Sequence, residues 1–118
     1  MKYAVIISLL ILSSCTYKSQ ESLLTGNWRP VAIEKDNKPF ITVAETDYLN
    51  LKADHTFYYE LVKASKYMHG TWKYEDEKLM LTYDSLNITR TFSVSELSGY
   101  NLIFSENNTV FSYIRLKN

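Results

Sequence analysis

The stretch YMHGTWKYEDEKLMLTY, residues 67–83, decides the expected fold of this chain of 118 residues. Apolar and aromatic side chains recur at every second position on either side of a polar tip at Asp76 and Glu77. Because successive side chains of a β-strand point to opposite faces, this alternation predicts two strands with a shared buried face, joined as an antiparallel hairpin. The residues expected on the inward face are Gly70, Trp72, Tyr74, Leu79, Leu81 and Tyr83.

The same pattern continues on both sides of this hairpin, and turn-forming residues separate the segments. Such spacing is typical of a β-sandwich or a β-barrel. We expect an all-β fold, an antiparallel up-and-down β-barrel of about eight strands, because closing the sheet removes its unpaired edges. A two-sheet β-sandwich is the alternative. The expected strands are Asn27–Lys35, Tyr48–Lys52, Thr56–Lys63, Tyr67–Glu75, Lys78–Asp84, Ile88–Val94, Tyr100–Ser105 and Thr109–Leu116.

The connection between the first two expected strands, Asp36–Asp47, is the longest in the domain. All later connections are short enough for hairpins. The long connection is expected to contain a short helical or lid-like turn through Thr42–Glu45.

The N-terminal residues have a different character. Lys2 is followed by an apolar run, Tyr3–Leu12, and by small residues that lead to Cys15. A basic start, a short apolar core and small residues before the cleavage point are typical of a secretory signal. The run has about half the length of a membrane-spanning helix.

Leu12-Ser13-Ser14-Cys15 resembles the lipobox of bacterial lipoproteins, and Cys15 is the only cysteine of the chain. The resemblance implies cleavage before Cys15 and acylation of its thiol. Residues 1–14 are then the signal peptide, residues 15–22 the acylated cysteine and a flexible linker, and residues 23–118 the β-barrel domain. The implied location is the cell envelope, anchored by acyl chains in the outer membrane of a Gram-negative bacterium, since no aspartate follows Cys15.

A glycine and a tryptophan stand at the beginning of the first expected strand, in Thr25-Gly26-Asn27-Trp28. This Gly-x-Trp pattern resembles the first signature of lipocalins. The resemblance implies that Trp28 closes one end of the barrel and that a basic residue of the last strand, Arg115, packs across its ring in a cation–π contact.

Two further stretches, Asp54-His55-Thr56-Phe57 and Gly70-Thr71-Trp72, match the repeating pattern of small lipocalin-like domains found in Gram-negative lipoproteins. The resemblance therefore extends from Leu23 to Leu116. It implies a barrel that holds a small ligand, although 104 mature residues form a shorter chain than a typical lipocalin.

Ten tyrosines, five phenylalanines and two tryptophans are many for such a chain and suggest an aromatic cavity. The alternative is that these rings merely fill the interior of a small barrel, which eight strands leave just wide enough for side chains. The residues expected to line a ligand cavity are Tyr59, Trp72, Tyr74, Tyr83 and Tyr100.

Other classes of function find little support in the sequence. Without Lys2, twelve basic residues face thirteen acidic ones, so no basic footprint for nucleic acid is expected. His55 and His69 are the only histidines, and with no cysteine left beside them we expect no metal site and no cofactor. No Gly-x-Ser-x-Gly motif or other catalytic frame is present, so we do not expect an enzyme.

Two functions remain open after these exclusions. The first is binding of a small apolar or amphipathic molecule inside the barrel. The second is a protein-binding module of the envelope, such as an inhibitor, an immunity factor or a complex subunit, which would use the long first connection and the outward aromatic faces. Asp84-Ser85-Leu86 also resembles an O-glycosylation site of some Gram-negative lineages and falls in an expected turn.

Overall fold

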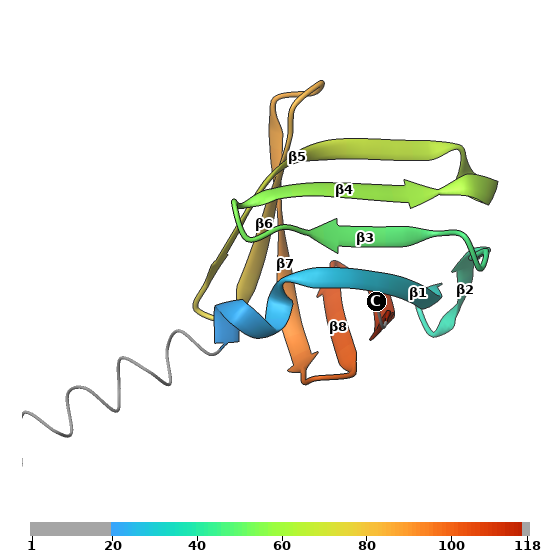
Figure 1. Cartoon of the computed structure of the whole chain (residues 1–118). Helices are drawn as coiled ribbons and strands as arrows, with labels where there is room; N and C mark the ends of the chain where they lie inside the picture. Colours follow the sequence, from blue (N-terminus) through green and yellow to red (C-terminus); the bar gives the residue numbers. More distant parts are fainter. Residues whose placement is uncertain (1–19, 117–118) are drawn as a thin grey trace, which may run out of the picture.

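The computed structural model describes residues 20–116, which form one closed β-barrel (Figure 1). Several strands are joined by tight turns, and asparagine or aspartate often takes the left-handed conformation there, as at Asp36 (φ 53°) and Asn37 (φ 65°). The strands are β1 (Gly26–Lys35), β2 (Lys38–Ile41), β3 (Tyr48–Leu51), β4 (Thr56–Leu61), β5 (Lys66–Glu75), β6 (Lys78–Tyr83), β7 (Ile88–Leu97), β8 (Asn101–Glu106) and β9 (Thr109–Arg115).

Pairing of the first strand with the last closes the barrel. The sheet runs in the order β2-β1-β3-β4-β5-β6-β7-β8-β9, and β1 pairs in addition with β9, from Trp28 opposite Arg115 to Lys35 opposite Thr109. All pairings are antiparallel. The expected up-and-down barrel of eight strands is confirmed, and the two-sheet alternative is wrong because the sheet closes on itself. β2 is one extra strand outside the closed ring.

The long first connection differs from the expectation. It contains β2, which forms a hairpin with β1, and a turn at Glu45 and Thr46, while no helix is described between residues 42 and 47. β2 was missed because Lys38-Pro39-Phe40-Ile41 shows no apolar alternation. The first half of β1 pairs with β3, at residues 26–28, and its second half pairs with β2, at residues 33–35.

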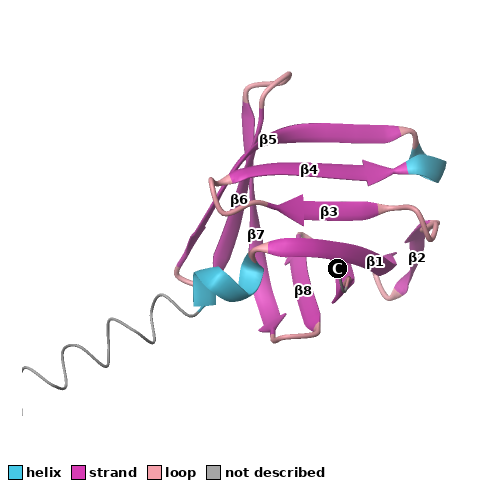
Figure 2. Ribbon diagram, viewed as in Figure 1, coloured by secondary structure: helices cyan, strands magenta, loops and turns pink. Residues whose placement is uncertain are grey.

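Two short helical segments mark opposite ends of the barrel (Figure 2). A helix over residues 20–24 precedes β1, so the end of the expected linker, residues 20–22, belongs to the folded domain. A 3-10 turn, Val62–Ala64, ends β4 before the expected Lys63, and Ser65 then adopts a left-handed conformation (φ 53°).

The core lies inside the ring, where the inward positions of all eight barrel strands meet. Alternation places the inward residues correctly along most strands, with Leu49 and Leu51 of β3 and Leu79 and Leu81 of β6 nearly inaccessible to solvent. Asp47 is the one buried charged side chain among the described residues. Its carboxylate accepts the backbone N–H groups of Ala44 and Val62, each at 2.8 Å, and so fastens residues 42–47 to the 3-10 turn.

Candidate functional site

The end of the barrel that carries the helix is closed by Trp28. Its ring is fully buried, and its indole N–H donates a hydrogen bond of 2.8 Å to the carbonyl oxygen of Leu24. The guanidinium carbon of Arg115 lies 4.2 Å from the centroid of this ring, so the predicted cation–π contact is present. We call this end, from residues 20–24 to Arg115, the closed end.

Arg115 also ties three chain segments together. Its Nε donates to the carbonyl oxygen of Gly99 at 2.8 Å, its Nη1 to that of Thr25 at 2.8 Å, and its Nη2 to that of Leu23. Gly26 is required beside it for two reasons. The residue has φ +134°, and a Cβ there would lie 2.5 Å from Nη1 of Arg115.

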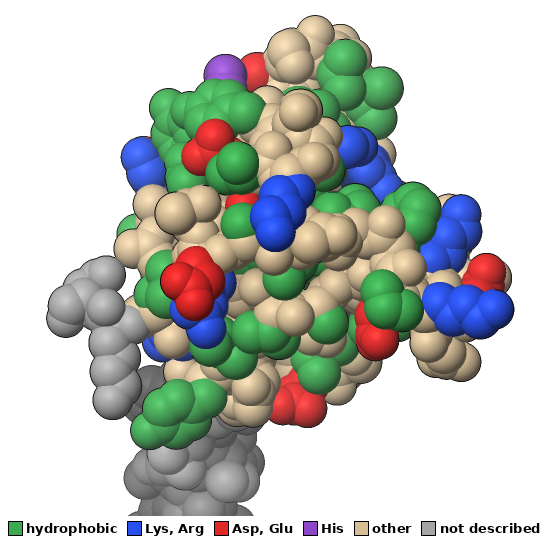
Figure 3. All heavy atoms as spheres, turned by 90° about the vertical axis from the view of Figure 1, so that its right-hand side faces the viewer, with side chains coloured by type: hydrophobic (Ala, Val, Ile, Leu, Met, Phe, Trp, Pro, Cys, Tyr) green, Lys and Arg blue, Asp and Glu red, His purple; other side chains and the backbone are tan. Residues whose placement is uncertain are grey.

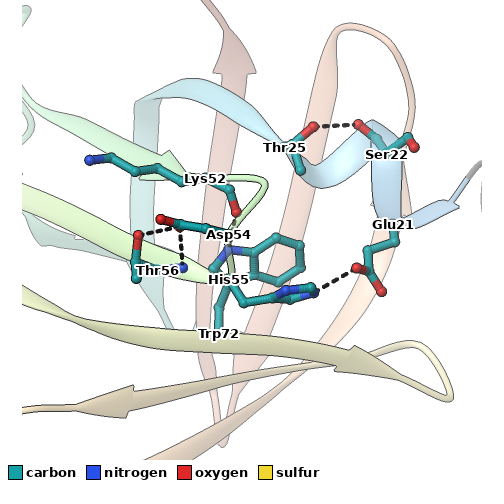
Figure 4. A network of polar contacts seen from close by, with 8 residues as sticks. All are labelled: Glu21, Ser22, Thr25, Lys52, Asp54, His55, Thr56 and Trp72. Atoms are coloured by element: carbon teal, nitrogen blue, oxygen red, sulfur yellow. Dashed lines mark hydrogen bonds and ion pairs between the residues drawn. The ribbon is translucent and has the colours of Figure 1, made fainter.

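A second set of contacts fastens the helix to the turn between β3 and β4 (Figure 4). His55 Nε2 lies 2.6 Å from Oε1 of Glu21, and the His55 ring packs against Trp72 with centroids 4.9 Å apart. The Trp72 indole donates to the carbonyl oxygen of Lys52 at 2.9 Å. The closed end is thus filled by packed rings whose polar atoms are hydrogen-bonded.

The opposite end is hollow, and we call it the open end. A cavity of about 120 Å³ reaches the surface there, between β2 and the inner face of the barrel. Figure 3 looks onto this end and shows hydrophobic side chains interspersed with both basic and acidic ones. The cavity is lined by Phe40, Ile41, Leu49, Tyr59, Leu61, Lys66, Leu81, Tyr83, Arg90, Phe92, Phe104, Thr109, Phe111 and Tyr113.

Three phenols and a guanidinium give this apolar cavity polar groups. Burial raises the pKa of Tyr83 and Tyr113 well above the ordinary value of 10.0, and the neighbouring Tyr59 adds to the effect. Burial also raises the pKa of Tyr59. These hydroxyls therefore stay neutral at physiological pH, and neutral hydroxyls can both donate and accept hydrogen bonds.

Arg90 lies close enough to Tyr59 and Tyr83 for its positive charge to oppose the rise in the pKa of both phenols. It forms a two-pronged ion pair with Glu106, in which Nε donates to Oε2 at 3.1 Å and Nη2 donates to Oε1. The hydrogen bond to Glu106 raises the pKa of Arg90, which keeps the guanidinium charged. Its carbon lies 5.4 Å from the centroid of Phe92. Arg90 therefore lines the cavity with its charge already balanced by Glu106, which is not itself a lining residue.

Of the five expected cavity residues, only Tyr59 and Tyr83 line the open cavity. Trp72 and Tyr74 lie on the inner face but toward the closed end, where Tyr74 borders Gln20 and Glu21. Alternation along a strand indicates which face a residue occupies but not at which end of the barrel it lies. This is why Trp72 and Tyr74 share the inner face with Tyr59 and Tyr83 but do not line the open cavity.

Tyr100 does not point inward at all, with 71% of its surface exposed. The expected strand began at this residue, whereas β8 begins at Asn101. The hydroxyl of Ser98 accepts the backbone N–H groups of both residues, at 3.3 and 3.0 Å, and so bends the chain just before the strand. The alternation of Leu102 and Phe104 therefore does not extend back to residue 100.

Sequence reasoning missed Arg90 and Tyr113 as cavity residues. The sequence did indicate both positions. Arg90 lies two and four residues before Phe92 and Val94, and Tyr113 lies two residues before Arg115, so each shares a strand face with residues that were expected to point inward. A charged residue among inward positions of a strand was the clue to a polar site inside the barrel.

The remaining candidate residues have local partners or lie elsewhere. His55 pairs with Glu21, and His69 lies 3.2 Å from Asp84. Within residues 20–116, no group of three His, Cys, Asp or Glu side chains gathers as a metal site would require. Ser85 is exposed in the turn between β6 and β7. The signal peptide and Cys15 lie outside the described residues.

Comparisons with known proteins agree with this architecture. A protein from Bacteroides eggerthii of uncharacterised function has 16% sequence identity and a TM-score of 0.62, covering 78% of this chain and 98% of its own. A lipocalin-like protein from Bacteroides uniformis has 14% identity and a TM-score of 0.64, covering 80% of this chain and 99% of its own. At such identities the likeness shows the fold alone.

The comparison with curated proteins finds no match. The family model of the lipocalin-like domain matches residues 24–104, from the end of the helix into β8. This range includes Gly26 and Trp28 of the closed end and most of the cavity wall. The chain therefore belongs to the lipocalin-like domain family.

Proposed function

We propose that this protein binds a small amphipathic molecule at the open end of its barrel, as a binding protein without catalytic activity. The observation that carries the proposal is the cavity between β2 and the inner face, which combines an apolar wall with three neutral phenols and Arg90. Apolar walls with a few convergent polar groups are typical of small-molecule sites.

The size of the cavity limits what it can enclose. Its volume of about 120 Å³ is close to that of an engineered cavity of about 150 Å³ that holds benzene. Pockets for drug-sized ligands are larger, at roughly 300–1,000 Å³. The proposed ligand therefore inserts an apolar group no larger than a phenyl ring and keeps the rest of the molecule at the rim.

The binding proposal is tested with 3-phenylpropan-1-ol, a neutral probe whose ring matches the cavity. Isothermal titration calorimetry on the purified full chain should show saturable binding of one probe per chain. Ile41→Trp should weaken binding about tenfold or more, because the larger ring would occupy the cavity that Ile41 lines. Lys38→Trp adds the same ring at an exposed position of the same strand and should change affinity less than twofold. Absence of binding to the unaltered chain would refute the proposal.

We also propose that the protein is a lipoprotein, acylated at Cys15 and anchored in the cell envelope at the outer membrane. The support is the lipobox-like Leu12–Cys15 after a basic and apolar start. No helix described within residues 20–116 has the length and apolarity needed to cross a membrane. Cys15→Ala should move the protein from the membrane fraction to the soluble fraction, and retention in the membrane would refute acyl anchoring.

A second candidate function, protein binding, is favoured by one observation at the open end. In the described chain, β2 pairs with β1 alone, and Phe40 on it is 55% exposed. A strand with one free edge can accept an extended segment of another protein. Crosslinking in cells followed by purification would support this function if a stoichiometric partner attached to β2 were recovered. It would count against it if crosslinks were absent from residues 38–41.

A further inference from the structure

We infer that the open end selects a small carboxylate, with its apolar group in the cavity and its acid group at Lys66. This inference rests on the proposed binding function and names the chemical class of the ligand. Its basis is the position of Lys66 relative to the cavity and the sign of every charge that lines the open end.

Lys66 emerges on the inner face of the barrel at the rim. It is the first residue of β5 and stands directly opposite Leu61 of β4. Residues directly opposite each other on neighbouring strands have side chains on the same face. Because Leu61 is buried in the interior, the Lys66 side chain also begins on the interior side, and it lines the cavity.

The charges at this end leave a positive group without a partner. The described cavity wall contains Lys66 and Arg90 but no aspartate or glutamate, and the adjoining hollow adds Lys63. Arg90 is neutralised by Glu106. Within residues 20–116, no carboxylate lies within ion-pair distance of the Lys66 ammonium.

The one buried carboxylate nearby does not serve as that partner. Asp47 accepts two backbone N–H groups, from Ala44 and Val62, and these satisfy its oxygens within the loop. An anionic ligand would therefore meet an unneutralised ammonium at the rim, while a cationic ligand would be repelled by it. A carboxylate held by an ammonium forms a charge-assisted hydrogen bond, which is stronger than a bond between neutral groups.

The size of the cavity limits the apolar group that the carboxylate can carry. A phenyl ring or a short branched alkyl chain matches a cavity of about 120 Å³, and because Lys66 lines the same cavity, the acid group is placed on a short linker. Free arylalkanoic acids and short branched fatty acids share this chemistry. A long unbranched fatty acid would leave most of its chain in water.

The test compares three probes that share one ring and one linker: 3-phenylpropionate, 3-phenylpropan-1-ol and 3-phenylpropylamine. Calorimetry on the full chain at pH 7 should rank them carboxylate, alcohol, amine, with the carboxylate about three- to fivefold tighter than the alcohol. The advantage of the carboxylate should shrink as salt is raised, because the rim is exposed to solvent.

Lys66→Gln should lower the affinity for the carboxylate to that for the alcohol and leave the alcohol within twofold of its original affinity. Lys66→Arg should retain the preference. Lys38→Gln removes the same charge at the same end from a side chain that does not line the cavity, and should leave the ranking unchanged.

The outcomes separate the inference from the proposed function. Equal binding of carboxylate and alcohol, or a preference that survives Lys66→Gln, would overturn the carboxylate inference and leave the binding function standing. Failure of all three probes to bind would overturn both.

Discussion

Trp28 and Tyr83 lie at opposite ends of one barrel and illustrate two uses of an aromatic side chain. At the closed end, Trp28 is sealed between the helix and Arg115, and its only polar atom donates to the Leu24 carbonyl. At the open end, Tyr83 borders a cavity with a neutral hydroxyl. Trp28 plugs the barrel interior at one end, where the hollow of about 180 Å³ between Gln20 and Tyr74 lies beside the helix, and the interior is left incompletely filled at the other end. Substitutions should therefore affect stability at the first end and binding at the second.

The largest effect is expected from Trp28→Ala at the closed end. Removing a fully buried ring leaves a cavity that the surrounding strands cannot fill, and the free energy of unfolding should fall by about 3–5 kcal/mol. Urea unfolding followed by circular dichroism measures this change. An unchanged urea concentration at the midpoint of unfolding would contradict the role of Trp28 in closing this end of the barrel.

A second prediction uses two glycines of the closed end as a matched pair. Gly26→Ala should destabilise the fold by roughly 2–3 kcal/mol, because alanine disfavours φ +134° and its Cβ would displace the Arg115 guanidinium. At Gly99 a Cβ would have no heavy atom within 4 Å. Gly99→Ala should therefore change stability by less than about 0.5 kcal/mol. Equal effects of the two substitutions, measured by thermal unfolding, would show that the Gly26 environment is not constrained.

The buried phenols of the open end predict sensitivity to alkali. The pKa of Tyr113 is raised by burial, so above pH 10 the unfolded chain releases a proton that the folded chain retains. Stability is therefore complete below about pH 10 and falls as pH rises further, by at most about 1.4 kcal/mol per pH unit for each such phenol. Tyr113→Phe should reduce this slope.

Urea titrations at a series of pH values from 9 to 11.5 would measure the slope. Tyr100→Phe, which removes a phenol from the exposed surface, is the control for losing a tyrosine. If Tyr113→Phe and Tyr100→Phe have the same alkaline dependence, the Tyr113 hydroxyl is not protected from ionisation by the barrel.

The smallest effect is expected at the rim of the open end. Phe40→Gln replaces a ring that is 55% exposed on a strand outside the closed barrel, and stability should change by less than about 0.5 kcal/mol. The same thermal unfolding measurement applies. A loss of several kcal/mol would mean that β2 supports the barrel as the closed end does.

The closed end could be predicted from the sequence far better than the open end. Gly26, Trp28 and Arg115 carry a pattern of local spacing and strand position, and their contact is present in the structure. Alternation likewise placed Leu81 and Tyr83 on the inner face. Short-range patterns of this kind follow from the two-residue repeat of a strand.

The open end depends on features that have no two-residue repeat. β2 contains Pro39 and shows no apolar alternation. The Asp47 carboxylate accepts the backbone N–H of Val62, which lies fifteen positions away in sequence. The depth of Trp72 and Tyr59 along the barrel depends on the register of whole strands. These properties are set by tertiary pairing, so a single sequence does not reveal them.

The helix over residues 20–24 also determines how the molecule would stand on a bilayer. Five peptide units separate Cys15 from Gln20, a reach of at most roughly 18 Å when fully extended. With Cys15 acylated as proposed, the helix and Trp28 would face the lipid headgroups and the mouth beside Lys66 would face away from them, toward the aqueous compartment. The proposed anchor and the proposed binding site would then lie at opposite ends of the barrel, so a ligand would reach Lys66 without passing the anchored end.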